Sequence, residues 1–244
     1  YDRLPYASEI ESAGQAYEVG RQIGAELKEL GLAVNLAPVC DVNTNPDNPV
    51  IGFRAFGDNV QRVSDFASAY AKGLHDEGIG ACAKHFPGHG DTSVDSHKGL
   101  PVVNHDRARL DSVELAPFKR MIKEDVDMVM MGHLSVPALD PSGVPSSISK
   151  PIYELLRNEL GYKGVIVTDG LMMQGLLKHF DGDDVSASVA AYKAGADMLL
   201  GACSVRKIID AITQRVENGE FSSEELDAKV FRVLKLKKKL HIIQ

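Results

Sequence analysis

Residues 79–91 read IGACAKHFPGHGD, an apolar run that changes abruptly into polar residues and glycine. The part from 79 to 86 has the length and composition of a β-strand, and a helix-period segment ends just before it at Gly78. A strand enclosed by helices is typical of parallel pairing, because parallel strands need a crossover connection. The stretch therefore predicts an α/β fold with polar residues at the carboxyl end of a strand.

The same alternation extends in both directions along the chain. Apolar runs predict four more strands, and the first is apolar enough to be buried on both faces. These strands are expected at residues 32–42, 128–133, 165–168 and 197–200. The helices are expected at residues 8–30, 60–74, 111–123, 149–160, 185–194, 205–217 and 223–240. Five such strands are compatible with a (β/α) barrel or with an open doubly wound sheet.

The composition is that of one soluble globular domain. The 244 residues are 44% hydrophobic and 25% charged, and this length falls within the span of a single α/β barrel. A net charge of -7, without a basic stripe, argues against a nucleic-acid surface. The cationic run Lys235–Lys239 ends a helical pattern, where it complements the helix dipole. No stretch has the length of a membrane span.

The cysteine and histidine spacings predict no metal site and no disulfide frame. The three cysteines lie far apart, each in an apolar run, which indicates buried thiols. They are Cys40, Cys82 and Cys203. The histidines His85, His89 and His97 share no helical i, i+4 spacing and match no common zinc signature. We therefore expect neither a metal nor another cofactor.

Polar side chains follow four of the five predicted strands. Asp41 lies at the end of the first strand, Lys84 and His85 end the second, His133 ends the third and Asp169 follows the fourth. In parallel α/β architectures the carboxyl ends of the strands meet at one edge, where ligands bind. The sequence therefore predicts that these residues share one site.

The predicted site suits a small ligand that is rich in hydroxyl groups. Lys84 and Arg54 can donate hydrogen bonds to sugar oxygens, and His85 can do the same in a fixed tautomer. Cationic neighbours would hold Asp169 ionised, as a nucleophile requires. The alternative is a purely structural role, in which Asp169 only caps the turn after its strand.

The loop after residue 91 carries a second candidate group, Asp95-Ser96-His97. A carboxylate beside an imidazole orients the ring and stabilises its protonated form, which a general acid/base needs near neutral pH. His89, between two glycines, is expected to shape this loop. Asp41 either orients its neighbours or contacts the ligand.

Five motifs, in the expected order, resemble the catalytic domain of family 3 glycoside hydrolases, and the β-N-acetylhexosaminidases most of all. The run KHFPGHG at 84–90, with DSH at 95–97 and LP at 100–101, resembles the signature loop of that group. The other matching elements are APVCDV at 37–42, RAFG at 54–57 and VTD at 167–169.

The resemblance implies a retaining exo-β-N-acetylglucosaminidase that releases terminal GlcNAc from peptidoglycan fragments or chitooligosaccharides without a cofactor. Asp169 would form a covalent glycosyl-enzyme, and His97, paired with Asp95, would protonate the leaving oxygen and then activate water. The Asp-Ser-His element favours N-acetylglucosaminides over glucosides. The implied sugar-binding residues are Arg54, Lys84, His85 and His133.

The family barrel begins with three strands that have no counterpart in this sequence. We therefore expect residues 1–244 to form a (β/α)8 TIM-type barrel domain that lacks its first three strands. We also expect the sequence to be part of a longer protein and to be inactive alone, because the barrel cannot close. Many family members carry a further domain, which here would follow Gln244.

Two alternatives stay open. The first is a β-glucosidase or a glycoside phosphorylase of the same family, since a neutral histidine acid/base tolerates an incoming phosphate better than a carboxylate does. The second is a catalytically silent sugar-binding segment. The compartment is open as well: the composition fits a bacterial cytoplasm, periplasm or cell surface equally.

Overall fold

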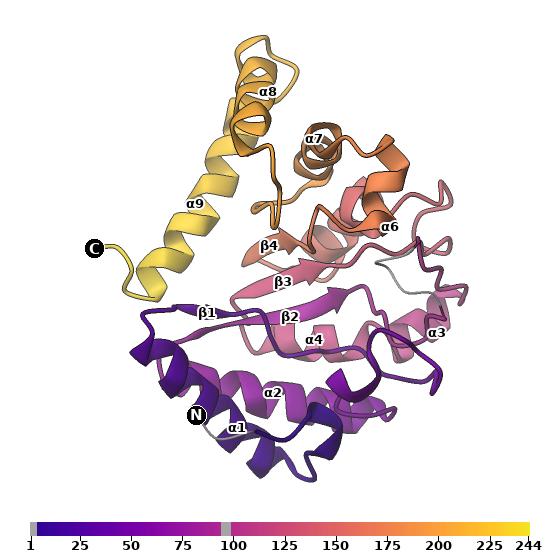
Figure 1. Ribbon diagram of the computed structural model, residues 1–244, viewed down its shortest axis with the longest axis vertical. Coiled ribbons are helices and arrows are strands. Elements are labelled where there is room, and N and C mark those ends of the chain that lie inside the picture. Colours follow the sequence, from indigo (N-terminus) through magenta and orange to yellow (C-terminus); the bar gives the residue numbers. More distant parts are fainter. Residues whose placement is uncertain (1–3, 94–98) are drawn as a thin grey trace.

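The computed structural model describes residues 4–93 and 99–244. Within them, four parallel strands form one sheet in the order β1-β2-β3-β4, and α1, α2 and α4 lie along one side of it (Figure 1). The strands are β1 (Val34–Asn35), β2 (Gly80–Phe86), β3 (Met128–Met131) and β4 (Val165–Thr168). The predicted parallel α/β architecture is confirmed.

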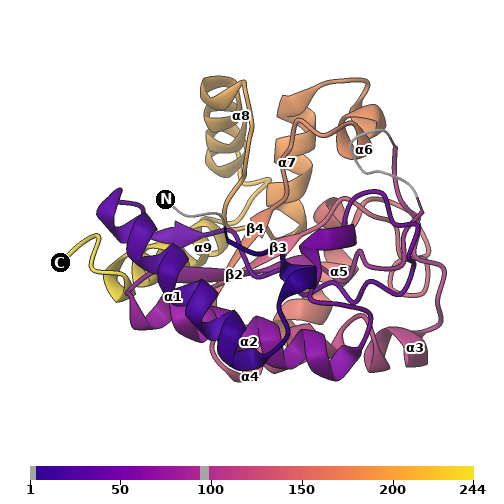
Figure 2. The same cartoon turned by 60° about the horizontal axis from the view of Figure 1, so that its bottom comes forward.

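The helices alternate with the strands, as expected. They are α1 (Ala13–Glu29), α2 (Val60–Asp76), α3 (Arg107–Ser112), α4 (Ala116–Lys123), α5 (Lys150–Glu154), α6 (Gln174–Leu177), α7 (Asp184–Ala194), α8 (Val205–Glu217) and α9 (Ser223–Lys239). Helix α5 continues as a π-helical turn over Leu155–Glu159. Helices α7 and α8 stand side by side (Figure 2). None of the helices in the described part of the chain is long and apolar enough to cross a bilayer.

Two helix predictions differ from the structure in their limits. The first helix starts at Ala13 because the Ser12 side chain accepts a hydrogen bond from the Gln15 N–H at 3.1 Å, whereas the sequence favours a start at Ser8. The helix expected at residues 111–123 is divided into α3 and α4. Pro117 has no backbone N–H to donate and would clash with the preceding turn of a continuous helix, so a new helix begins there.

The two faces of the sheet carry different apolar clusters, because side chains alternate along a strand. One face packs against α2 and α4 through Ala81, Ala83, Val129, Met131 and Ile166. The opposite face carries Cys82, Met128, Met130, Val165 and Val167. Val233 and Leu236 of α9 pack against this second face. An apolar cavity of about 310 Å³ lies between α9 and the strands.

The first predicted strand is shorter than expected, but its backbone pairing with β2 continues. After Asn35 the Cys82 N–H donates to the Ala37 carbonyl at 2.8 Å, and the Cys40 N–H donates to the Lys84 carbonyl at 2.6 Å. Pro38, which lacks an N–H, interrupts a regular ladder. The extended segment therefore delivers Asp41 to the carboxyl end of β2.

The fifth predicted strand is reduced to a single parallel bridge between Met198 and Val167. Backbone hydrogen bonds still place the segment beside β4, with Thr168 N–H donating to the Met198 carbonyl at 3.1 Å and Leu171 N–H to the Leu200 carbonyl at 2.9 Å. The segment therefore occupies the position of a fifth strand without forming a regular one.

Asp197 joins α9 and the turn after α5 to the sheet. Its fully buried carboxylate accepts from Arg232 Nη2 at 2.8 Å and from the Ile166 N–H at 2.8 Å, and it pairs with Arg157. We predict that Asp197→Ala lowers the free energy of unfolding by about 3 kcal/mol, because the mostly buried Arg157 loses its counter-charge.

Urea denaturation checks this prediction, with Asp210→Ala on the exposed face of α8 as the control. The control is expected to change the free energy of unfolding by less than about 0.5 kcal/mol. Equal effects of the two substitutions would contradict the assigned role of Asp197.

Candidate active site

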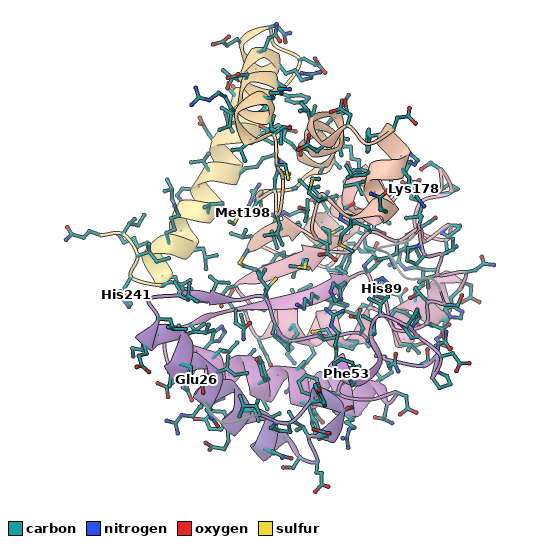
Figure 3. The ribbon with its side chains drawn as sticks, viewed as in Figure 1. Glu26, Phe53, His89, Lys178, Met198 and His241 are labelled. Carbon is teal, nitrogen blue, oxygen red and sulfur yellow. The ribbon has the colours of Figure 1, made fainter. Side chains whose placement is uncertain are left out.

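The carboxyl ends of β2, β3 and β4 meet at one edge of the sheet. Phe86 pairs with Met131, and Met131 pairs with Thr168, so the three strands end level with one another. The predicted residues at this edge are Lys84, His85, His133 and Asp169. Figure 3 shows His89 at the same edge, beyond the end of β2. The strand ends therefore bring the predicted groups together as parallel pairing requires.

Asp41 fixes the orientation of His85. Both side chains are buried, and Asp41 Oδ2 lies 2.8 Å from His85 Nδ1. Because a carboxylate only accepts, Nδ1 carries the proton, and Nε2 of the neutral ring presents a lone pair. Nε2 lies 3.4 Å from Nη2 of Arg54, whose Nη1 donates to the Val50 carbonyl at 3.1 Å. With a neutral ring, Nε2 therefore accepts, where the sequence predicts a donor.

Asp41 also holds the loop after β2. Its Oδ1 accepts the backbone N–H groups of His89 at 2.7 Å and of His85 at 3.2 Å. The loop packs so closely that a Cβ on Gly90 would lie 1.9 Å from the Val42 carbonyl oxygen, which only glycine permits. Of the two roles open to Asp41, this geometry favours orientation of its neighbours.

The Asp41 carboxylate links protonation to stability. Burial opposes its ionisation, but His85 and the hydrogen bonds from His85 and His89 outweigh burial and hold the pKa of Asp41 below its ordinary value of 3.8. The pKa of Asp41 in the folded chain lies below that in the unfolded chain. The stabilisation is therefore complete above the unfolded pKa and is lost as the pH falls through the folded pKa.

We therefore predict a free energy of unfolding that declines as the pH falls below 4, and less steeply in Asp41→Asn than in the wild-type chain. Urea denaturation at pH 3 to 6 measures both curves. Parallel curves for the two proteins would contradict the assigned ionisation of Asp41.

Asp169 lies directly beyond β4 and is half-buried. Its backbone N–H donates to the Met131 carbonyl at 2.9 Å, which ties it to the end of β3. Its Oδ1 accepts the Gly170 N–H at 2.7 Å. One carboxylate oxygen is therefore held by the turn, and the strand end sets the position of the whole side chain.

The surroundings of Asp169 keep it ionised. Burial opposes ionisation, but the His85 and His133 imidazoles, the Gly170 N–H and the Lys84 ammonium together hold the pKa of Asp169 below its ordinary value. An ionised, half-buried carboxylate is what nucleophilic attack requires. The environment of Asp169 therefore meets the requirement of the predicted nucleophile, while its Oδ1 also caps the turn.

Lys84 is the cation of this edge that remains available to a ligand. Burial, followed by the repulsion from Arg54, lowers its pKa, whereas Asp169 and Asp41 act in the opposite direction. In the part of the chain that the structure describes, its Nζ makes no hydrogen bond. A partly desolvated ammonium group without an acceptor can bind a hydroxyl oxygen of a ligand.

His133 contacts protein atoms through both ring nitrogens. The side chain is fully buried; Nδ1 lies 2.7 Å from Ser147 Oγ and Nε2 lies 2.9 Å from the Gly170 carbonyl oxygen. The sequence prediction did not include Ser147, which lies between two other serines, Ser146 and Ser149. No local pattern distinguishes it from its neighbours.

The predicted acid/base pair, Asp95 and His97, lies outside the described residues. The residues before it are anchored: Asp91 accepts from Thr44 Oγ1 at 2.9 Å, and Thr92 Oγ1 lies 2.7 Å from Nδ1 of the buried His89. Across residues 4–93 and 99–244, no three His, Cys, Asp or Glu side chains are placed to hold a metal ion together.

The level strand ends and the ionised aspartate among cationic side chains define a barrel-type α/β domain with a site for a polar ligand. The sequence profile of the "Glycosyl hydrolase family 3 N terminal domain" matches residues 4–236. The chain belongs to glycoside hydrolase family 3.

Comparison with known proteins supports this assignment. The chain is 40% identical to beta-hexosaminidase A of Pseudoalteromonas piscicida, over 92% of the chain and 41% of that protein. The structure of a family 3 beta-N-acetylglucosaminidase from Paenibacillus sp. str. FPU-7 superposes with a TM-score of 0.90 and 42% identity, over 97% of the chain and 45% of the other. Beta-glucoside phosphorylase BglX gives a TM-score of 0.88 at 25% identity, over 97% and 44%.

The chain thus spans less than half the length of these three proteins. The high TM-score with the Paenibacillus structure confirms the predicted fold class, and the four-stranded parallel sheet is an incomplete barrel of that type.

Proposed function

We propose that this chain carries the catalytic barrel of a retaining exo-β-N-acetylglucosaminidase. The observation that supports the proposal most directly is the ionised, half-buried Asp169 at the strand edge that also carries Lys84 and the Asp41–His85 pair. The similarity to proteins named beta-hexosaminidase A and beta-N-acetylglucosaminidase supports the choice of an acetamido sugar. Terminal GlcNAc of peptidoglycan fragments or chitooligosaccharides is the proposed substrate.

In the proposed mechanism, Asp169 attacks the anomeric carbon and the glycosidic bond breaks, which gives a covalent glycosyl-enzyme. His97, assisted by Asp95, protonates the leaving oxygen and then removes a proton from the water that hydrolyses the intermediate. These two roles rest on the motif alone.

The remaining polar groups would bind and orient the sugar. Lys84 and Arg54 donate to hydroxyl oxygens, and Nε2 of neutral His85 accepts from a hydroxyl group, because Asp41 holds the proton at Nδ1. These contacts place the anomeric carbon against Asp169, and orientation of this kind accounts for a large share of enzymatic rate enhancement.

The test is hydrolysis of 4-nitrophenyl β-N-acetylglucosaminide and of the matching glucoside by the longer protein that carries residues 1–244 and by its Asp169→Ala and His97→Ala variants. Release from the acetamido sugar that is lost in both variants supports the proposal. Binding of GlcNAc without turnover would favour the sugar-binding alternative, and preference for the glucoside would contradict the substrate assignment. Proton NMR separates the mechanisms, since retention releases the β-anomer first.

A second candidate is phosphorolysis, which the similarity to a beta-glucoside phosphorylase favours. The cationic Lys84 and Arg54 beside Asp169 would attract a phosphate ion as well as a sugar. Product analysis with and without inorganic phosphate separates the reactions: a sugar 1-phosphate appears only in phosphorolysis, whereas free GlcNAc appears in hydrolysis.

A further inference from the structure

We infer that His133 and Ser147 are positioning residues that fix the turn carrying Asp169, and that His133 does not contact the sugar. The inference deepens the proposed function, because it takes Asp169 as the nucleophile. It replaces the sugar-binding role that the sequence suggests for His133.

The hydrogen bonds of His133 define its tautomer. Nε2 lies 2.9 Å from the carbonyl oxygen of Gly170, and because a carbonyl oxygen only accepts, Nε2 carries the proton. With a neutral ring, Nδ1 is then an acceptor, and Ser147 Oγ, at 2.7 Å, donates to it. Ser147 thus holds the imidazole in the tautomer that donates to the turn.

Further buried hydrogen bonds hold Ser147 and its neighbour Ser146 in place. Ser147 is fully buried, and its carbonyl oxygen accepts from the Tyr153 hydroxyl group of α5 at 3.0 Å. The adjacent Ser146 donates from Oγ to the Leu134 carbonyl at 2.6 Å. A continuous set of buried hydrogen bonds therefore runs from α5 through Ser147 and His133 to Gly170.

The bond to His133 is the long-range tether of the Gly170 carbonyl. That oxygen also accepts the Met173 N–H at 3.0 Å, but this bond lies within the turn and moves with it. His133 instead lies just beyond β3, so its bond ties the turn to the sheet. Gly170 has no Cβ to restrict rotation, so the His133 bond adds to the bonds from the Asp169 N–H to Met131 and from the Leu171 N–H to Leu200 in fixing the direction of the Asp169 carboxylate.

Burial argues against a sugar contact by the same ring. His133 has 0% exposure, and each ring nitrogen already faces a protein atom at hydrogen-bond distance. A hydroxyl group of the substrate could reach a ring nitrogen only by displacing Ser147 or Gly170. The two roles therefore predict different kinetics.

The test compares His133→Met with His133→Gln in the glycosidase assay. Methionine fills a similar volume without a donor, whereas the glutamine amide places an N–H near the position of Nε2. We expect His133→Met to lower kcat about 10²-fold with KM within about threefold of wild type, and His133→Gln to recover kcat to within about tenfold. A rise in KM at unchanged kcat in both variants would overturn the inference, because it indicates lost sugar binding.

A double-mutant cycle tests the coupling of the pair. Ser147→Ala is expected to lower kcat about tenfold in the wild-type background and to have no further effect in His133→Met, because the hydrogen bonds of the described residues connect Ser147 to the Asp169 turn through the ring. Fully additive effects would overturn the proposed coupling.

Nitrogen-15 NMR of His133 provides a readout that does not depend on turnover. We expect a ring protonated at Nε2, and a proton at Nδ1 alone would overturn the inference. Should the longer protein that carries residues 1–244 cleave no glycoside, the proposed function fails. The tautomer of His133 still decides the positioning role, as does the carbonyl chemical shift of Gly170, which should change in His133→Met.

Discussion

Asp169→Ala is expected to lower kcat for the release of GlcNAc by about 10⁴-fold while the chain stays folded. The carboxylate is the proposed nucleophile, and loss of a covalent catalyst typically costs a factor of this order or more. The fold should persist because the side chain is only half-buried, and because the backbone N–H at residue 169, which donates to the Met131 carbonyl at 2.9 Å, does not depend on the carboxylate.

Initial rates and far-UV circular dichroism check the two parts of this prediction. Azide provides a sharper test, because this small anion can enter the space left by the carboxylate and attack the anomeric carbon. We expect azide to raise the rate of Asp169→Ala and to yield an α-glycosyl azide. Asp210→Ala, on the exposed side of α8, serves as a control with wild-type rates. Activity of Asp169→Ala within tenfold of wild type would exclude the nucleophile role.

Much of this site could be predicted, because the amino-acid sequence indicates where each strand ends. The change from apolar to polar residues marks where a strand stops, and parallel pairing places those stops at one edge. Lys84, His85 and Asp169 therefore come together although Asp169 is far from the other two in the chain.

The rest depends on contacts that no local pattern encodes. Ser147 and Asp41 act through hydrogen bonds to residues distant in sequence, and the serines around Ser147 read alike. The predicted start of the first helix is wrong for a related reason. Ser8 and Ser12 are both acceptable helix caps, and only the tertiary fold selects Ser12. The segment at residues 197–200 is long enough to be recognised as a strand but forms only one bridge.

Asp41→Asn is expected to lower kcat/KM about 10²-fold, although Asp41 contacts no substrate in the proposed mechanism. The amide oxygen can still accept the His89 N–H, but the amide NH₂ then faces His85 Nδ1, which must become an acceptor. The ring proton moves to Nε2, where it opposes the Arg54 guanidinium 3.4 Å away and no longer accepts from a sugar hydroxyl. An imidazole held in the wrong tautomer is known to cost catalysis heavily even when the geometry is unchanged.

The chain offers a matched control at the opposite end of the barrel. Asp127 is a buried aspartate whose Oδ2 lies 2.6 Å from His75 Nε2 and accepts the Ala81 N–H at 2.9 Å, so Asp127→Asn makes the same chemical change away from the site. We expect Asp127→Asn to reduce stability but to leave kcat/KM within about threefold of wild type, and nitrogen-15 NMR to show the proton of His85 moved to Nε2 only in Asp41→Asn. Both substitutions disturb a buried carboxylate–imidazole pair, but only the Asp41–His85 pair lies at the strand end that carries Asp169. Equal losses of kcat/KM in the two variants would therefore mean that Asp41 acts through stability alone.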